Sequence, residues 1–256
     1  MVIKDYLKRI GFEGEAKADY DTLYELQYRH FLSVPYENLD ILNKVDLSLE
    51  ISALYNKVVE RGRGGYCFEL NALFNWLLCE IGFKTITYFA RFLLDEPDIK
   101  KVMRRHRIMR VEINGEYYLA DVGVGCVTPE RSLKLVENEE TEIRGVIYKF
   151  NKDPFLGWVL NYKYLNKNKD WQKLYSFTEE PQIDVDFIQP DFYCQYHEDS
   201  IFNKNNMIAI RTQTGKYTLD GNLFKEADLT GKIIEAKEYE PNEIPGVLEK
   251  YFGLAF

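Results

Sequence analysis

The spacing of apolar residues changes near position 85, and this change constrains the fold more than any other feature of the sequence. Before it, apolar side chains recur at helical spacing, as in Leu70, Leu73 and Leu77. After it, residues 86–195 are rich in β-branched and aromatic residues, which is typical of strands. A helical part followed by a strand-rich part predicts an α+β fold.

The predicted organisation has three parts. Residues 1–85 are expected to be helical, residues 86–195 strand-rich, and residues 196–256 a small α/β end. No internal repeat or low-complexity tract interrupts this order.

Two local signals are clearer than the others. The best helix begins near Cys67 and stops at Gly82, a typical residue after a helix. The strongest hairpin signal is Asn114-Gly115, between strands expected at 107–113 and 116–122. Weaker patterns predict helical segments around 23–31 and 53–59, strands at 85–94, 146–150, 158–164, 207–212 and 216–219, and a closing helix at 243–252.

The composition excludes several functional classes. The 256 residues include 33 cations and 41 acids, a formal charge of −8, so no basic excess supports nucleic-acid binding. Apolar residues make up 46%, which allows a sizeable core and argues against disorder. No apolar run approaches the ~20 residues that span a bilayer, and the first residues lack the apolar segment of a secretory signal. We expect no nucleic-acid or membrane partner, and a monomer or small homo-oligomer.

The cysteine pattern also indicates the cellular compartment of the protein. Their spacing lacks the CxxC pairs of zinc sites and the density of disulfide frameworks. We therefore expect free thiols, no metal and a cytoplasmic protein. The four residues are Cys67, Cys79, Cys126 and Cys194.

Cys67 stands where the glycine-rich segment beginning at Arg63 enters the predicted helix. A helix N-terminus favours an anion, so this position is expected to stabilise a thiolate and to lower the thiol pKa. Gly64 and Gly65 are expected to let the backbone approach a ligand, with N–H groups available for an oxyanion. The alternative is a buried structural cysteine, a common environment for free thiols.

A nucleophilic cysteine needs a base, and the chain has three histidines. His30 lies in the helical part and is expected in the core or at a helix cap. His197 lies in a polar stretch and is expected at the surface. His106, just ahead of the Asn114-Gly115 hairpin, is therefore the candidate base.

The two-residue turn also predicts which residue orients His106. It fixes a register in which Ile108 faces Asp121. His106, two residues earlier, then lies diagonal to Asp121 on the same face, roughly 7–8 Å away at the backbone. A coincidental pairing is the alternative interpretation. With Cys67, these residues match the nucleophile, base and orienting acid of a catalytic triad.

Five stretches resemble arylamine N-acetyltransferases, in order along nearly the whole chain. Residues 63–71 (RGGYCFELN) resemble the family's Arg-Gly-Gly-x-Cys signature and the helix after it. Residues 34–39 (VPYENL) resemble its Pro-Phe-Glu-Asn-Leu block, and residues 118–125 (YLADVGVG) resemble its Asp-Val-Gly-Phe-Gly block. Residues 197–202 (HEDSIF) and 248–254 (LEKYFGL) also fit.

The resemblance implies a helical bundle, a central β-barrel and a C-terminal α/β lid. It also implies ping-pong acetylation of an arylamine, arylhydroxylamine or hydrazine, with acetyl-CoA as the donor. Cys67 would attack the thioester, and the acceptor amine would then attack the acetyl-cysteine. His106 would manage the amine proton, and Asp121 would hold His106.

Three further residues receive roles from the same resemblance. Arg63 and Glu37 would be structural supports of the site, and Tyr36 would line the acceptor pocket. The alternatives are a surface ion-pair partner for Arg63, a solvated loop charge for Glu37 and a core position for Tyr36.

The sequence departs from the family pattern at two places. Val124 stands where the Asp-Val-Gly-Phe-Gly block has an aromatic residue. If Val124 borders the acceptor pocket, that pocket should be wider or less able to stack an aryl ring. Gly62 separates Arg61 from Arg63, where the family often has Arg-Arg-Gly-Gly. These departures bear on substrate preference more than on the chemistry.

A basic run lies next to His106, with six cations and no acid in eleven residues. Charge runs are usually solvated faces, and that is one interpretation. The other is a local positive field for the phosphates of acetyl-CoA, with Arg104 and Arg105 as the contacts. Reversing both charges should then raise the KM for acetyl-CoA in a salt-dependent way. The six residues are Lys100, Lys101, Arg104, Arg105, Arg107 and Arg110.

Two other kinds of protein would use the same residues. A Cys-His-Asp thiol hydrolase or transglutaminase-like enzyme uses the same nucleophile, base and orienting acid. A catalytically inactive relative would keep the fold and act as a binding module. Acetyl-CoA should leave one stable acetyl group on Cys67 only in an acetyltransferase. Iodoacetamide should select Cys67 below pH 7, whereas Cys79, expected in the helix interior, should react slowly.

Overall fold

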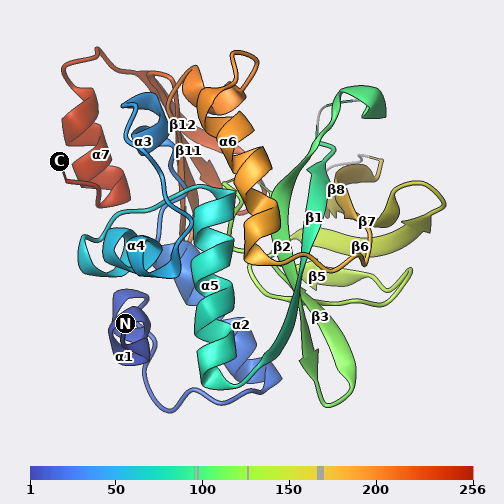
Figure 1. Ribbon diagram of the computed structural model, residues 1–256. Coiled ribbons are helices and arrows are strands. Elements are labelled where there is room, and N and C mark those ends of the chain that lie inside the picture. Colours follow the sequence, from blue (N-terminus) through green and yellow to red (C-terminus); the bar gives the residue numbers. More distant parts are fainter. Residues whose placement is uncertain (95, 97, 126, 166–169, 256) are drawn as a thin grey trace.

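The computed structural model describes residues 1–94, 96, 98–125, 127–165 and 170–255. In these ranges helices pack on two antiparallel sheets, so the predicted α+β class is confirmed (Figure 1). Within them, no helix combines the length and the apolar character needed to cross a membrane.

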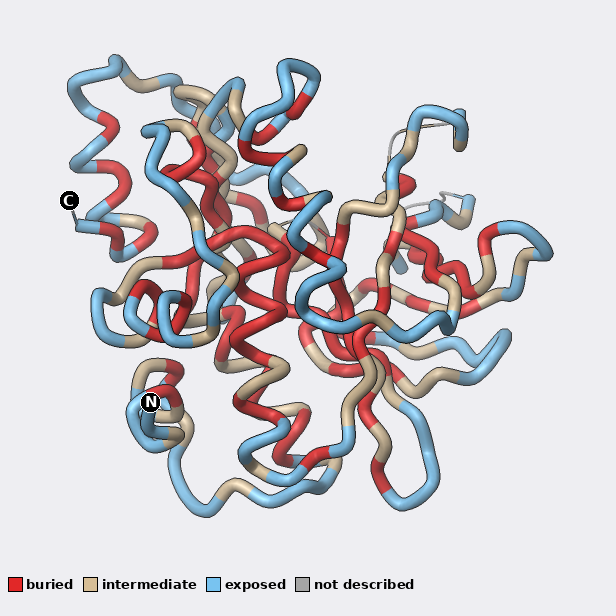
Figure 2. The backbone as a smooth tube through the Cα atoms, in the orientation of Figure 1, coloured by how far each residue is buried: buried red, intermediate tan, exposed pale blue. Residues whose placement is uncertain are grey.

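The first part of the chain is helical, as predicted. Its longest helix, α5 (Cys67–Ile81), lies near the centre of the molecule and is buried along most of its length (Figure 2). It ends at Gly82, whose φ of 106° is readily adopted by glycine. Four other helical segments pack against it in the first hydrophobic core. They are α1 (Ile3–Arg9), α2 (Tyr20–Ser33), α4 (Ile51–Tyr55) and the π-helical segment η1 (Asn56–Glu60). The short helix α3 (Leu39–Leu42) belongs to other clusters, through Leu39 and Ile41.

An eight-stranded antiparallel sheet forms a nearly closed barrel, with the strand order β4-β3-β2-β1-β8-β7-β6-β5. The segment after β4 connects the two ends of the sheet, because Glu137 forms a bridge with Phe150 of β6. Inward-facing side chains such as Tyr88, Leu160 and Phe177 form a second core. The strands are β1 (Lys84–Phe92), β2 (Arg104–Ile113), β3 (Glu116–Ala120), β4 (Leu133–Lys134), β5 (Thr141–Ile143), β6 (Val146–Asp153), β7 (Gly157–Tyr164) and β8 (Gln172–Phe177).

The hairpin between β2 and β3 has the predicted turn and register. Asn114 and Gly115 have φ values of 53° and 79°, as a type I′ turn requires. The pairing extends to Met109 opposite Ala120, which is the predicted alignment. This register leaves Asp121, the residue after β3, close to the first half of β2, which contains His106.

A four-stranded antiparallel sheet, ordered β12-β11-β10-β9, packs with α7 (Ile244–Phe252). One face carries Leu219 and Phe224 and packs with α7 in a third core. On the other side, Ala209 of β9 forms a bridge with Tyr36 of the helical part. The strands are β9 (Met207–Thr212), β10 (Gly215–Asp220), β11 (Leu223–Asp228) and β12 (Ile233–Glu238).

Part of the region predicted as strands is helical. Helix α6 (Ile188–Tyr196) crosses beside α5 and β2 (Figure 1). Its residues Ile188, Phe192 and Tyr196 recur at helical spacing, and this apolar stripe is exposed, whereas Cys194 is buried. The division of the chain at positions 85 and 195 stays a prediction. The short 3-10 segments are η2 (Ile99–Lys101), η3 (Asp184–Phe187) and η4 (Ile201–Asn203).

Candidate active site

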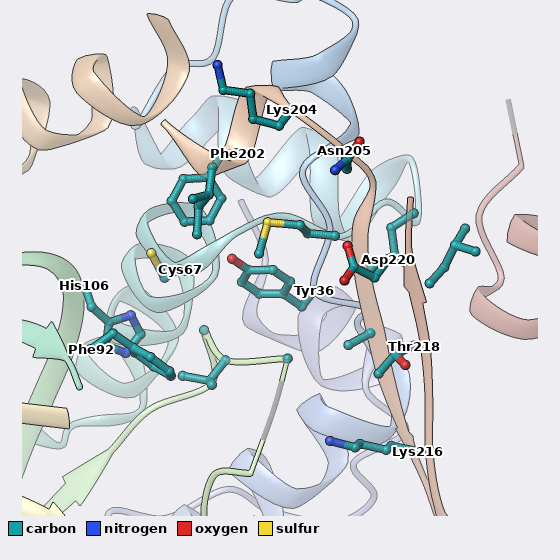
Figure 3. Close-up of a pocket in the computed structure, with 18 of the residues that line it drawn as sticks. Tyr36, Cys67, Phe92, His106, Phe202, Lys204, Asn205, Lys216, Thr218 and Asp220 are labelled. Carbon is teal, nitrogen blue, oxygen red and sulfur yellow. The ribbon is translucent and has the colours of Figure 1, made fainter. Parts of the chain in front are cut away.

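The helical part, the barrel and the C-terminal sheet meet around a cavity of about 710 Å³. Figure 3 shows Cys67 and His106 on one side of this cavity and the strand with Thr218 on the other. The apolar lining includes Tyr36, Phe92, Val124, Phe202 and Met207, and the charged lining consists of Arg105, Lys204, Lys216, Asp220 and Lys225.

His106 and Asp121 are joined by the contact that the hairpin register predicts. His106 Nε2 lies 2.7 Å from Asp121 Oδ2, and both side chains are almost fully buried. The second carboxylate oxygen, Oδ1, accepts hydrogen bonds from Asn71 Nδ2 at 2.8 Å and from the Gly123 backbone N–H at 2.9 Å. The carboxylate is therefore held on both oxygens, and Nδ1 of His106 is the ring nitrogen left for another partner.

Asn71 is a site residue to which the sequence analysis gave no role. Its side-chain amide also donates to the Arg107 carbonyl at 2.5 Å and accepts from the Val122 N–H at 2.9 Å. Asn71 follows Cys67 by one helical turn, so it ties the helix of the thiol to the strand and loop of the histidine–aspartate pair. A polar residue four positions after Cys67, on an otherwise apolar stripe, is the signal that could have identified it.

A β-bulge in β2 turns Arg105 and His106 towards the same cavity. Ala90 of β1 pairs with His106, and the next pair in the ladder skips Arg105. Neighbouring residues of a regular strand point to opposite faces, yet both of these residues line the cavity. Bulges re-aim side chains in this way at functional sites.

Cys67 is the first residue of α5, with its thiol 3.8 Å from the Arg105 carbonyl oxygen. Burial raises the pKa of the Cys67 thiol well above its usual value, and nearby Cys194 and Asp121 raise it further. Two backbone N–H groups oppose this shift without reversing it. The predicted lowering of the pKa is therefore wrong, because complete burial outweighs the effect of the helix N-terminus.

The glycines before Cys67 contact the protein itself. A Cβ atom on Gly64 would lie 2.0 Å from the Pro35 carbonyl oxygen, and one on Gly65 would lie 2.9 Å from Glu69 Oε2. Neither glycine lines the cavity, so the expected approach of a ligand to this loop is wrong. Gly123 is the glycine that packs on the site, since a Cβ there would lie 2.7 Å from the Cα atom of the candidate nucleophile.

Arg63 and Glu37 belong to a buried charge network, which also contains Asp40, Lys57 and Glu69. Arg63 Nη2 lies 2.8 Å from Glu37 Oε1 and 2.9 Å from Asp40 Oδ1. Lys57 Nζ lies 2.8 Å from Asp40 Oδ2 and 2.7 Å from Glu69 Oε1. Glu37 is fully buried and Arg63 nearly so, which excludes the solvated and surface alternatives for these two residues.

The charge network also fixes the start of α5. Glu69 Oε2 accepts a hydrogen bond from the Tyr66 backbone N–H at 3.0 Å, which satisfies a donor at the helix N-terminus. Burial raises the pKa of Glu69 to about 7, although Lys57 opposes the shift. Burial alone would lower the pKa of Lys57, but the surrounding carboxylates raise it.

The six cations of the basic run do not form one surface. Arg105 lines the cavity, whereas Arg104 is outside the lining and has Nη1 3.5 Å from Glu180 Oε2. Arg107 is buried, with Nη2 2.7 Å from Asp184 Oδ1 and its guanidinium over an aromatic ring. The solvated-face interpretation is therefore wrong for Arg107, whose side chain is buried and whose charge is paired with Asp184.

The remaining thiols and imidazoles have different environments. His30 is buried and His197 is exposed, as predicted. Cys194 is buried on α6, and Cys126 lies outside the described residues. Cys79 is exposed, which corrects its predicted place in the helix interior, because position 79 lies off the apolar stripe of α5.

Tyr36 and Val124 both line the cavity. Phe92, Phe202 and the cavity-lining residues of the C-terminal sheet were not predicted as site residues, although a C-terminal lid was expected. These residues come from segments far apart in the sequence, and no local pattern marks them as neighbours. No group of three or more side chains suited to hold a metal ion gathers among the described residues.

Known proteins resemble this chain over nearly its whole length. A family model described as N-acetyltransferase matches residues 19–256. The arylamine N-acetyltransferase of Escherichia coli K12 is 29% identical, covering 99% of this chain and 89% of that protein. The Mycolicibacterium smegmatis arylamine N-acetyltransferase is 31% identical, covering 86% and 80%. The solved Salmonella typhimurium arylamine N-acetyltransferase has a TM-score of 0.91 at 27% identity, covering 98% and 90%.

A Mycobacterium marinum arylamine N-acetyltransferase, solved in complex with CoA, has a TM-score of 0.90 at 28% identity, covering 98% of this chain and 92% of that chain. Together these matches define the class of protein, an acyltransferase enzyme. The chain belongs to the arylamine N-acetyltransferase family.

Proposed function

We propose that this protein acetylates arylamines, arylhydroxylamines or hydrazines by a ping-pong mechanism, with acetyl-CoA as donor and acetyl-Cys67 as intermediate. The observation that carries the proposal is the 2.7 Å contact between His106 Nε2 and Asp121 Oδ2 in the cavity that Cys67 also lines. The CoA complex of the Mycobacterium marinum relative supports CoA as the leaving group.

In the first half-reaction, His106 accepts the proton of the Cys67 thiol at Nδ1, the ring nitrogen that Asp121 does not hold. The thiolate attacks the thioester carbonyl, a bond forms between the acetyl carbon and the Cys67 sulfur, and the bond to the CoA sulfur breaks. The proton on His106 passes to the departing CoA thiolate. Asp121 stabilises the transient imidazolium and keeps the ring oriented.

In the second half-reaction, the amine nitrogen attacks the carbonyl of acetyl-Cys67. His106 accepts the proton that the amine loses, the bond between the acetyl carbon and sulfur breaks, and the Cys67 thiolate leaves. Transfer of that proton to sulfur restores the starting enzyme. The raised pKa of Cys67 makes His106 essential to both halves, because the buried thiol does not ionise by itself near neutral pH.

The remaining roles follow the geometry of the cavity. Tyr36 and Val124 border the acceptor, and Arg105 is the better placed of the two arginines proposed for the donor phosphates. Arg63 and Glu37 support the site through the backbone before α5. The cytoplasmic location and the monomeric or small homo-oligomeric state stay predictions of the sequence.

The test is direct observation of the intermediate. Incubation with acetyl-CoA followed by mass spectrometry should find one acetyl group, on the peptide that contains Cys67, and aniline should discharge it as acetanilide. Cys67→Ala should remove the acetyl group, and the control Cys79→Ala, at an exposed thiol, should retain it. Release of acetate without an amine would favour the thiol hydrolase, and absence of acetyl-Cys67 would overturn the mechanism.

A further inference from the structure

The C-terminal sheet contributes a polar region of the cavity to which the acetyl-transfer steps give no role. Lys216 and Thr218 of β10 and Lys225 of β11 line the cavity, and these three residues are termed the lysine subsite. Lys225 is directly opposite Thr218 and diagonal to Lys216 in the ladder, so all three share one face. Diagonal neighbours lie roughly 7–8 Å apart at the backbone, which lets both ammonium groups reach one anion over Thr218.

The lysine subsite is partly shielded from solvent. Its three side chains are partly buried, whereas Lys204 and Asp220, which also line the cavity, are exposed. Figure 3 shows Lys216 and Thr218 across the cavity from Cys67. Partial burial strengthens the attraction between an ammonium group and an anion, because less water screens it.

The acid on the same face does not neutralise this subsite. Asp220 lies diagonal to Lys225 in the ladder, but within the described residues neither Lys225 nor Asp220 forms an ion pair. Arg211, which faces Lys216 from β9, already contacts Glu130 at 3.2 Å. The cavity wall on this sheet is therefore cationic, although the protein as a whole carries a charge of −8.

Val124 connects the lysine subsite with the departure from the family pattern. Val124 and Lys216 both line the main cavity and the small recess beside it. An aromatic side chain at position 124 would occupy part of this space and offer a stacking surface to an aryl ring. Valine leaves the space open towards Lys216. An acceptor therefore lacks an aromatic ring to stack on at position 124 and can instead contact the ammonium group of Lys216.

We propose that Lys216, Thr218 and Lys225 are specificity-determining residues of this cavity, and that they bind the carboxylate of an acidic arylamine acceptor such as an aminobenzoate. The inference rests on the proposed function, because it assigns the acceptor of the same cavity. The donor phosphates are the other source of an anion. They are separated from the thioester by the long pantetheine arm, whereas the carboxylate of an aminobenzoate is one ring away from its amine.

The first test measures binding without chemistry. On the Cys67→Ala background, calorimetry with 4-aminobenzoate and aniline should show at least roughly tenfold tighter binding of the anion, weakening as salt is added. Lys216→Met and Lys225→Met should each weaken 4-aminobenzoate binding by roughly tenfold and leave aniline within about twofold. The control Lys232→Met, at an exposed position outside the cavity lining, should change neither ligand.

The second test isolates the acceptor half-reaction. Acetyl-enzyme prepared with 4-nitrophenyl acetate, which carries no phosphate, is discharged by either amine, and the ratio of the two rate constants is compared between proteins. This ratio should fall roughly tenfold in each lysine variant. Equal losses for both amines, or an effect confined to the KM for acetyl-CoA, would overturn the assignment. Absence of acetyl-Cys67 would contradict the proposed function instead, and the calorimetry would still decide the lysine subsite.

Discussion

Two clusters of buried polar groups flank the start of α5, and one of them opens into the cavity. The trio of Cys67, His106 and Asp121 keeps one imidazole nitrogen for the thiol beside it. The charge network on the other side pairs each of its carboxylates with a cation at 2.7–2.9 Å. Burial and charge are common to both clusters, so contact with the cavity and an uncommitted proton acceptor are what distinguish a reactive site from a support.

The two clusters also respond differently to burial. In the trio, burial raises the pKa of a thiol that has to lose its proton, so a base is required. The charge network holds three carboxylates and two cations, and burial raises the pKa of Glu69 to about 7. The expected consequence is that damage to the trio appears as lost activity, whereas damage to the charge network appears as lost stability.

The largest effect is expected for Asp121→Asn. The amide keeps the size of the side chain but removes the negative charge that orients and stabilises His106. We expect kcat/KM for aniline acetylation to fall by about 10³–10⁴-fold, with little change in the thermal midpoint. A loss below tenfold would assign Asp121 to support rather than to the reactive trio.

Lys57→Met tests the charge network rather than the trio. It leaves Asp40 and Glu69 buried without their shared cation, which should lower the unfolding free energy by about 3–5 kcal/mol. Urea unfolding measures this loss, and kcat per folded molecule should change less than tenfold. Adding Asp40→Asn and Glu69→Gln to the same variant should recover much of the stability, and no recovery would contradict the electrostatic explanation.

Glu69→Gln tests whether Glu69 makes the stability of the folded protein depend on pH. In the folded protein the pKa of Glu69 is about 7 instead of 4.5, so the folded state binds more protons between these values and stability falls as pH rises through them. The substitution removes that dependence, because an amide does not titrate in this range. The unfolding free energy of Glu69→Gln relative to the unmodified protein should therefore rise by roughly 2–3 kcal/mol from pH 5 to pH 8. Any contribution of buried His30 to the pH dependence of stability is present in both proteins and cancels. A difference in unfolding free energy between the two proteins that does not change with pH would refute the prediction.

The smallest effect is expected at the donor end of the cavity. Arg105→Glu should raise the KM for acetyl-CoA by roughly fivefold to tenfold at low salt, and less at high salt, because screening weakens the contact with phosphate. Arg104→Glu is the matched control, since Arg104 is outside the cavity lining and should stay within about twofold. Equal effects of the two reversals would indicate a diffuse field rather than a contact.

Local patterns predicted the elements that carry the candidate site. The apolar stripe and Gly82 predicted α5 to within its observed ends, and the Asn114-Gly115 turn predicted the β2–β3 register. That register was sufficient to predict that Asp121 lies beside His106, because the spacing along two short strands depends only on the turn between them.

Other features required contacts between distant segments. The bulge at Arg105 is defined by the pairing of β2 with β1, and the ion-pair partner of buried Arg107, Asp184, comes from the distant segment η3. Helix α6 was predicted as part of a strand-rich region, although Ile188, Phe192 and Tyr196 recur at helical spacing. The exposure of Cys79 did not require such contacts, because position 79 already lies off the apolar stripe of α5 in the sequence.

The sequence by itself determined the α+β class, the helix that begins at Cys67 and the pairing of His106 with Asp121, because these depend on period, capping and turn geometry within short stretches. The tertiary structure alone decided the chemical state of the thiol and the shape of the cavity. Burial of Cys67 reversed the pKa shift expected from its helix, because desolvation depends on everything packed around the sulfur. The wall that faces it, with Lys216 and Lys225, belongs to a sheet more than a hundred residues away in the chain.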